Sequence, residues 1–127
     1  MNDQTIEQEI QAKGLTAPRI TPADIEANIV SEHYFTACDG RYGALINETY
    51  VGTELPQVDD LDLEPLELIT FCVLILRNGH RIVGVNEGPV VAKNFDAELG
   101  RKIARAKAID AIYPLMGYEL RTKLSQQ

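Results

Sequence analysis

The feature that most constrains the fold is a pair of apolar segments separated by Arg77-Asn78-Gly79-His80. The first segment, residues 69–76, is the most apolar stretch of the chain, and the second, residues 81–85, is rich in β-branched side chains. Asn-Gly between two such segments is typical of a β-hairpin with a type I′ turn, because both turn residues then need a positive φ angle. The sequence therefore predicts a hairpin in which Arg77 pairs with His80.

This turn also fixes the expected pairing of the two strands. It places Ile75 opposite Ile82 and Leu74 opposite Val83, and it leaves both faces of the first strand apolar. A strand with two apolar faces has to be covered on both sides. We expect one side to be covered by a long helix and the other by the Thr21 helix, the 42–68 segment or a second subunit. Homo-oligomerisation is therefore an expectation for this chain.

A long helix is predicted to follow the hairpin, from about residue 95 to residue 113. Asn94 is the expected N-cap, and Asp96 in the first turn favours the positive end of the helix dipole. Pro114 is expected to end this helix, because proline lacks a backbone donor and its ring clashes with the preceding turn. A short helical tail is expected over residues 119–124.

Thr21-Pro22-Ala23-Asp24 predicts the start of another helix. The Thr21 hydroxyl can cap the helix, Pro22 suits its first position, and the Asp24 carboxylate can reach back to the cap. Apolar residues at helical spacing then predict that the helix runs to about residues 35–37. His33 lies on this stripe, where a satisfied, half-buried side chain is the expected role.

The length of 127 residues is that of a single domain. We expect an α+β fold over residues 21–127, in which a β-hairpin-centred antiparallel sheet packs against the long C-terminal helix. Strands from 42–68 are expected to extend the sheet, and the N-terminal helix covers another side. Residues 1–20 are expected to form a polar N-terminal arm that is loosely attached, with packing on a partner subunit as the alternative.

The charge and the N-terminus exclude several classes of protein. A net charge of −7 disfavours binding of duplex nucleic acid, which needs a basic footprint. The sequence contains no segment of membrane-spanning length and no signal peptide at Met1, so a cytoplasmic location and no membrane contact are expected. Cys38 and Cys72 are expected to be reduced thiols, with a structural role for Cys72 in its strand.

The sequence shows little that indicates catalysis. Ser31 stands near His33, but residues two apart on a helix point to different faces. No Cys/His cluster has zinc spacing, and the acidic residues 59–64 lack the glycine of a calcium loop. We therefore predict no catalytic residue, no metal ion and no cofactor, and we keep a small hydrolase only as a third hypothesis.

Five basic residues form the predicted ligand-binding site. Arg101, Lys102 and Arg105 share one side of the predicted C-terminal helix, and Arg77 and His80 stand at the hairpin end. Arginine offers planar, bidentate donors to phosphate, and two arginines one turn apart can clamp such a group. The competing interpretation is a solvated helix face whose charges pair with their helical neighbours.

Several stretches of the chain resemble a family of small tailed-phage proteins. They are ITPADIE at residues 20–26, SEHYF at 31–35, TFCVLILRNG at 70–79, NFDAELGRKIAR at 94–105 and YPLMGY at 113–118. The family is called the gene-product-forty-nine / gene-sixty-six family, after phages N-four and Sf-six. The resemblance implies a phage or prophage origin and a non-structural accessory role, but it carries over no functional residue. The chain departs from the family pattern after the hairpin, at residues 85–91.

Two functions are compatible with these features. The first is a phage accessory protein in the host cytoplasm, which counteracts host defence by sequestering an anionic, nucleotide-like signalling molecule at the five basic residues. The alternative is a protein–protein inhibitor or adaptor of a host enzyme that uses the acidic 48–67 surface.

Overall fold

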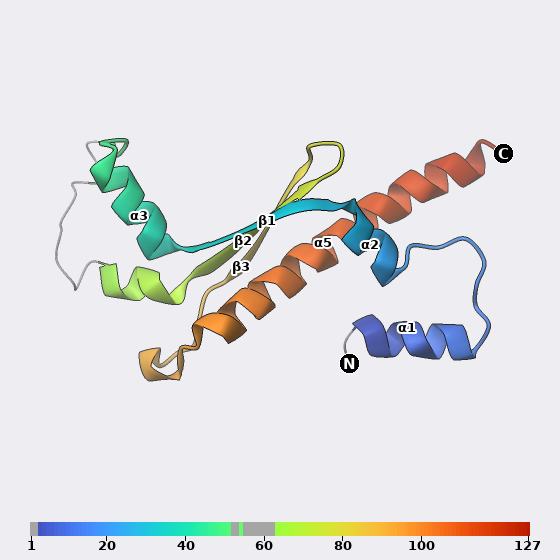
Figure 1. Cartoon of the computed structure of the whole chain (residues 1–127), viewed down its shortest axis with the longest axis horizontal. Coiled ribbons are helices and arrows are strands. Elements are labelled where there is room, and N and C mark those ends of the chain that lie inside the picture. The colour runs from blue at the N-terminus through green and yellow to red at the C-terminus, as the bar shows by residue number, and fades with distance from the viewer. Residues whose placement is uncertain (1–2, 52–53, 55–62) are drawn as a thin grey trace.

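The computed structural model describes residues 3–51, 54 and 63–127, and it has the α+β fold that the sequence predicts (Figure 1). A three-stranded antiparallel sheet of order β1-β2-β3 packs on a long C-terminal helix. The elements of the N-terminal half are α1 (Asp3–Ala12), α2 (Pro22–Asn28), β1 (Ile29–Thr36) and α3 (Ala37–Ile46). Those of the C-terminal half are η2 (Glu64–Leu68), β2 (Thr70–Leu76), β3 (Arg81–Asn86), η3 (Ala92–Asn94) and α5 (Ala97–Ser125).

The predicted hairpin is confirmed, but its turn is one residue longer than expected. Leu76 pairs with His80, because the Leu76 amide donates to the His80 carbonyl and the Gly79 amide donates to the Leu76 carbonyl, both at 2.9 Å. Only Gly79 of the turn has a positive φ, of 84°. These are the features of a three-residue loop that ends in a left-handed glycine, and not of a type I′ turn.

This longer loop shifts the strand register by one residue. Ile75 pairs with Arg81, Leu74 with Ile82 and Val73 with Val83, so the predicted pairs are wrong. A shift of one residue moves every side chain of a strand to the other face. Ile82 is therefore buried under α5 together with Leu74, whereas Val83 is 54% exposed on the opposite face.

The third strand comes from a segment that the sequence predicts as helix. The helix that begins at Pro22 ends at Asn28, and residues 29–36 form β1, which pairs with β2 from Ile29↔Leu76 to Thr36↔Thr70. Isoleucine, valine and aromatic residues dominate this segment, and these residue types favour strands. The apolar residues of this segment fit both a helix and a strand. The segment forms a strand because it pairs with β2.

The prediction that strands from 42–68 extend the sheet is wrong for the described residues. Thr36 caps α3 through a capping box of the same kind as that predicted at Thr21. Its hydroxyl accepts a hydrogen bond from the Asp39 amide at 3.1 Å. Residues 37–46 are thus helical, and residues 64–68 form the 3₁₀ helix η2, which packs against α3. The acidic residues 59–62 lie outside the described residues.

Helix α5 is longer than predicted at its C-terminal end. Its N-cap is Asp96, whose side chain accepts from the Leu99 amide at 2.9 Å, and not Asn94. Pro114 does not end the helix, which continues to Ser125 and includes the predicted tail. The ring of Pro114 is exposed, so the cost of this proline is limited to the missing hydrogen bond and local crowding of the backbone.

The core lies between the sheet and α5. Gly84 of β3 allows the closest approach, since a Cβ atom there would lie 2.0 Å from the Ala104 carbonyl oxygen. The buried cluster contains side chains from α2, β2, β3 and α5: Ile25, Cys72, Leu74, Leu76, Ile82, Ala104, Ala108, Ile109 and Ile112. The buried position of Cys72 agrees with its expected structural role.

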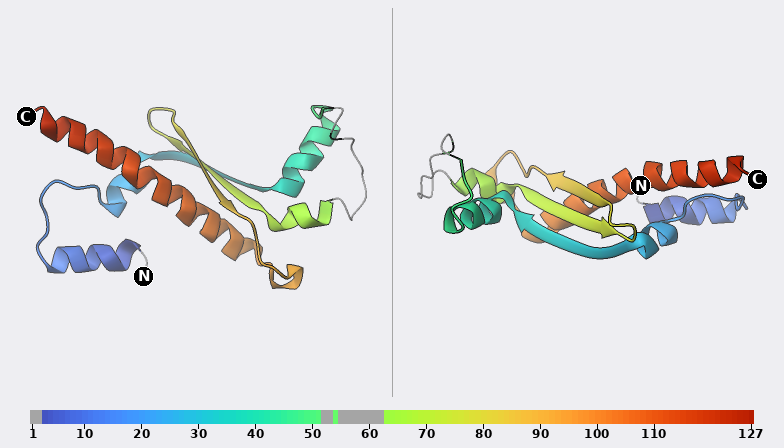
Figure 2. Two further views of the ribbon diagram at one scale, coloured as in Figure 1. Left: turned by 180° about the vertical axis from the view of Figure 1, so that it is seen from behind. Right: turned by 90° about the horizontal axis from the view of Figure 1, so that it is seen from above.

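The opposite face of the sheet, which we call the open face, carries apolar side chains from all three strands. Phe35 of β1 stacks on Phe71 of β2, with ring centroids 5.4 Å apart, and Val83 of β3, which pairs with Val73, is exposed on the same face. No helix of the described chain covers this face (Figure 2). Of the three expected covers, the Thr21 helix and the 42–68 segment are therefore wrong for the described residues, and a second subunit stays a prediction.

Candidate functional site

A groove of about 1090 Å³ lies between α1, α2 and α5. Its floor is apolar and includes Ile25 of α2 with Ile109 and Tyr113 of α5. Its rim is polar and includes three glutamines of α1, with Lys102 and Arg105 of α5 at one end. Binding sites for small molecules commonly combine such an apolar floor with a few polar groups.

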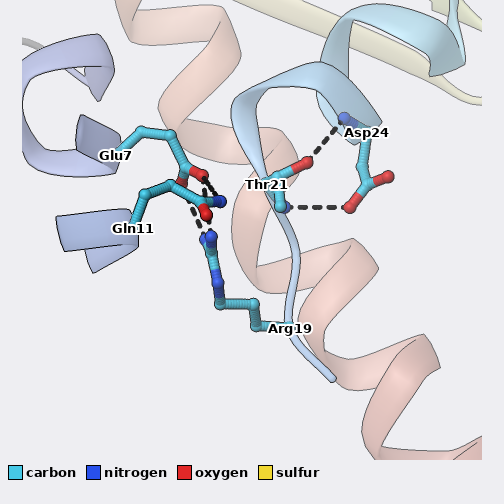
Figure 3. A network of polar contacts seen from close by, with 5 residues as sticks. All are labelled: Glu7, Gln11, Arg19, Thr21 and Asp24. Atoms are coloured by element: carbon cyan, nitrogen blue, oxygen red, sulfur yellow. Dashed lines mark hydrogen bonds and ion pairs between the residues drawn. The ribbon is translucent and has the colours of Figure 1, made fainter. Parts of the chain in front are cut away.

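The capping box of α2 forms part of the groove wall. The Thr21 hydroxyl accepts from the Asp24 amide at 3.1 Å, and the Asp24 carboxylate accepts from the Thr21 amide at 2.9 Å (Figure 3). The Thr21 and Asp24 amides, which have no acceptor within the helix, are both satisfied in this way. Pro22 lies at the first helical position, where its missing amide hydrogen costs nothing, so the start of the helix is well defined. The predicted cap is confirmed, and it presents Thr21 and Pro22 to the groove.

A bidentate ion pair holds α1 in its place beside α2. The Arg19 guanidinium donates to both oxygens of Glu7 at 2.7 Å, and the Gln11 amide donates to Glu7 at 2.8 Å (Figure 3). These bonds favour the charged carboxylate and lower the pKa of Glu7 to about 2. The N-terminal arm is therefore not structureless in its described part, since α1 forms one wall of the groove.

Arg105 connects three elements at the end of the groove. It donates to the two carboxylate oxygens of Glu26 in α2, at 2.8 and 3.0 Å, and to Glu32 in β1. The hydrogen bonds to Glu26 are the main reason why the pKa of Arg105 is raised. Two carboxylates neutralise this arginine, so we interpret it as a structural clamp and not as a free anion contact.

The structure divides the five predicted ligand-binding residues into separate places. Lys102 and Arg105 line the groove, whereas Arg77 and His80 line a second cleft of about 460 Å³ at the hairpin turn. This second cleft lies near Asn28, whose side chain contacts Met116 of α5.

Arg101 is exposed and lines neither cavity. Its neighbour Gly100 packs on Thr70, at the far end of the sheet from the hairpin turn. The five basic residues that the sequence predicts as one site are therefore separated in the fold.

Sequence reasoning missed the glutamine rim of the groove. Gln4, Gln8 and Gln11 lie one helical turn apart on α1, and all three line the groove with Tyr113. Their i, i+4, i+7 spacing is visible in the sequence and is the signal that could have found them. Their position opposite α5 in the groove is not visible there, because the two helices come from opposite ends of the chain.

The expectation that Ser31 and His33 point to different faces is wrong, since both lie on a strand. Residues two apart on a strand share a face, and His33 Nε2 lies 3.0 Å from Ser31 Oγ. The pair lies on the exposed open face of the sheet. A nucleophilic serine also needs an oriented base and donors for the oxyanion, so this pair alone does not indicate a hydrolase.

Within residues 3–51, 54 and 63–127, no group of three or more His, Cys, Asp or Glu side chains could hold a metal ion. Among the same residues, no helix is long and apolar enough to cross a membrane.

Comparison with known proteins identifies a family. The family model described as "Phage protein (N4 Gp49/phage Sf6 gene 66) family" matches residues 20–124. This range begins next to the capping box of α2 and includes the whole sheet, but it excludes α1. Neither a curated protein nor a solved structure shows significant similarity to the chain.

Proposed function

Because the chain belongs to the phage protein (N4 Gp49/phage Sf6 gene 66) family, we propose that it is a phage accessory protein that sequesters an anionic, nucleotide-like small molecule. The observation that supports this proposal is the groove of about 1090 Å³ between α1, α2 and α5. This volume lies just above the roughly 300–1,000 Å³ typical of small-molecule sites. Such a protein would act by stoichiometric binding in the host cytoplasm and counteract a nucleotide-based host defence.

The shape and chemistry of the groove suit a nucleobase. Tyr113 and Ile109 offer an apolar floor for a flat ring, and stacking on an aromatic side chain contributes about 1–3 kcal/mol per base. The carboxamides of Gln4 and Gln8 both donate and accept hydrogen bonds, which is what the polar edge of a base requires.

The charges of the groove suit a ligand of low negative charge. Glu7 is paired with Arg19, and Glu26 is paired with Arg105, so these four charges largely cancel. Two exposed charges of the groove lining remain: the cation Lys102, whose pair with Glu98 is exposed and contributes little, and the carboxylate Asp110. We therefore infer that one phosphate or phosphodiester group lies near Lys102, and not a polyphosphate clamped by five basic residues.

The first experiment is a release assay. The purified protein is incubated with lysate of cells whose nucleotide-based defences are active, and it is then washed and denatured. The released small molecules are identified by mass spectrometry. We expect one nucleotide-like species at near-stoichiometric amount, released unchanged. Release of a cleaved product would favour the hydrolase hypothesis, and an empty release would contradict sequestration.

Charge reversal then locates the site. Lys102→Glu is expected to weaken binding at least about tenfold, which corresponds to roughly 1.4 kcal/mol. Lys107→Glu is the matched control, because Lys107 is exposed on the same helix and is not a lining residue of the groove. Equal effects of the two substitutions would contradict binding in the groove. Arg105 is unsuitable for this test, because its reversal would leave Glu26 and Glu32 without their partner.

Filling the groove gives an independent test without a change of charge. Ala106→Trp projects a large ring from α5 into the groove, whereas Ala111→Trp is exposed on the same helix and is not a lining residue. We expect binding to be lost in the first variant and kept in the second, with both variants folded.

The protein–protein inhibitor or adaptor is the second candidate function. Four carboxylates of the acidic 48–67 surface are exposed on its described part, at Glu48, Glu54, Glu64 and Glu67. Among them, Glu54 is paired with Arg41 at 2.8 Å. Replacement of the other three glutamates by glutamine should abolish capture of a basic host protein, and unchanged capture would contradict this candidate.

A further inference from the structure

The second cleft, of about 460 Å³, lies between the hairpin turn, α2 and α5, and the proposed function does not use it. It shares no lining residue with the groove, because the two cavities lie on different sides of α2. α2 presents Ile25 and Glu26 to the groove, whereas it presents Asp24 and Asn28 to the cleft. The volume of the cleft is within the roughly 300–1,000 Å³ of small-molecule sites, so it has the size of a separate binding site.

Asn28 connects the three walls of this cleft. The Arg77 amide of the hairpin turn donates to the backbone oxygen of Asn28 at 3.0 Å and to its side-chain oxygen at 3.2 Å. The Asn28 side-chain nitrogen donates to the Met116 sulfur of α5 at 3.4 Å. Within the turn, the His80 amide donates to the side-chain oxygen of Asn78 at 2.9 Å. The walls are therefore held in place before a ligand binds, which lowers the entropic cost of binding.

Charges of opposite sign line the cleft on different walls. Arg77 and His80 belong to the hairpin turn, whereas Asp24 belongs to α2 and Glu119 to α5. Within the described residues, no ion pair joins a carboxylate to Arg77 or His80. Glu119 forms a pair with Lys123 at 3.5 Å, but this pair is exposed and contributes little. The basic and acidic walls thus do not neutralise each other, and both are available to a molecule between them.

The rest of the lining is largely apolar. It consists of Leu76, which is buried, together with Ala27, Leu115 and Met116. Leu115 is 44% exposed, so a ligand that covers it removes apolar surface from water. Methionine is flexible and polarisable, and it adapts to apolar groups of different shape. This apolar lining therefore suits an apolar side chain of a ligand.

We propose that the cleft binds a zwitterion with an apolar side chain, namely a free α-amino acid of the leucine or phenylalanine type. The Arg77 guanidinium binds the carboxylate through two parallel hydrogen bonds, and the His80 ring offers a further donor. The ammonium group lies between Asp24 and Glu119, and the apolar side chain lies on the apolar lining. A simple anion would satisfy Arg77 but would be repelled by the two carboxylates, so the charges of the cleft select a ligand that carries both signs.

Titration calorimetry with defined probes tests this ligand class. L-Leucine and L-phenylalanine are expected to bind, and L-alanine is expected to bind at least about tenfold more weakly than L-leucine, because it covers little of the apolar lining. N-Acetyl-L-leucine lacks the ammonium group, and L-leucine amide lacks the carboxylate. Each of these two derivatives is expected to bind at least about tenfold more weakly than L-leucine, because hydrogen bonds between charged groups are the strong ones. Inorganic phosphate should not compete with L-leucine.

Two pairs of matched variants locate the ligand. Arg77→Gln is expected to weaken L-leucine binding at least about tenfold, and it keeps the backbone bond to Asn28. Arg81→Gln is its control, because Arg81 is also exposed but does not line the cleft. Glu119→Gln is likewise expected to weaken binding, whereas Glu98→Gln should not. Both glutamates are exposed on α5 and pair with the lysine four residues further on, but Glu98 lies outside the cleft.

Each outcome supports or overturns the inference. Weaker binding in Arg77→Gln and Glu119→Gln but not in their controls supports it. Equal binding of L-alanine or of either blocked derivative overturns it, and so does an equal effect of a variant and its control. An absence of heat, together with unchanged amide NMR signals of Asn28 and Gly79 at millimolar L-leucine, also overturns it. None of these results bears on the nucleotide-like ligand, which the release assay and Lys102→Glu test separately.

Discussion

A Cβ atom on Gly84 would lie 2.0 Å from the carbonyl oxygen of Ala104, so the helix and the sheet touch through their backbones at this point. The same atom would lie 2.7 Å from the Ala108 amide nitrogen. No side-chain movement can relieve such contacts, because both atoms belong to the α5 backbone. The distance between α5 and β3 therefore depends on this one glycine.

Gly84→Ala is expected to destabilise the fold strongly. Overpacked core substitutions typically cost about 1–3 kcal/mol, and we expect the upper end or more here, because α5 as a whole has to shift. Urea unfolding measures the change in the free energy of unfolding. Gly43→Ala in α3 is the matched control, since a Cβ there meets no atom within 4 Å and alanine favours the helix. Equal stability of the two variants would contradict the close approach.

Arg105→Met is expected to destabilise the fold by about 1–3 kcal/mol, the usual range for charged hydrogen bonds. The substitution removes the donors of both Glu26 and Glu32, although these carboxylates are partly exposed and regain some hydration. Lys102→Met is the control, because its pair with Glu98 is exposed on both sides. A thermal unfolding series should place Lys102→Met within about 0.5 kcal/mol of the wild type. A similarly small effect of Arg105→Met would show that the clamp contributes little.

Acid should release α1 from the groove. The pKa of Glu7 is about 2 in the folded protein, below its ordinary value of 4.5, because Arg19 binds the charged form. A lowered pKa stabilises the docked state above pH 4.5, and this contribution is lost as the pH falls from 4.5 towards 2. Hydrogen exchange of the α1 amides should accelerate over this window. Glu7→Gln should give fast exchange already at neutral pH.

Glu9→Gln is the control for this measurement. Glu9 lies on the same helix, and its exposed pair is with Lys13, the residue that directly follows α1, so it does not tie α1 to another element. If Glu7→Gln and Glu9→Gln gave the same exchange rates, the ion pair with Arg19 would not hold α1 in place.

Pro114→Ala is expected to stabilise the protein by about 1–3 kcal/mol, because it restores a helix hydrogen bond and relieves backbone crowding. The proline ring is exposed, so little packing is lost. Guanidinium unfolding measures the change. A destabilised variant would mean that the proline shapes α5 in a way that the core requires.

The sequence predicts the fold where one local pattern dominates. Thr21 and Asp24 form the capping box that their spacing indicates, and the apolar runs around Gly79 form the hairpin. The register was wrong because one extra loop residue, Arg77, is compatible with the same Asn-Gly signal. The capping box of Thr36 and Asp39 has the same spacing as that of Thr21, but a helix predicted up to residues 35–37 leaves no place for a new helix to start at Thr36.

The candidate site is less accessible to sequence reasoning. Its walls, α1 and α5, come from opposite ends of the chain, and no local pattern encodes that they line the same groove. In the sequence, Arg105 has no evident partner, because Glu26 and Glu32 are distant along the chain and pair with it only in the folded protein. Local preference alone predicts that a helix ends at Pro114. Residues of α5 before and after Pro114 pack on the core, and this packing overrides the local preference.

The sheet order has a consequence for the sequence of folding events. β2 and β3 are joined by a three-residue loop, so their contacts form at little loop-closure cost. β1 joins β2 only after the long segment between Thr36 and Thr70 has closed, and such non-local contacts form slowly. We therefore expect the hairpin and α5 to associate first and β1 to arrive last. Until it does, β2 offers a free edge to any neighbouring chain, so a newly synthesised molecule is most prone to aggregate during this interval.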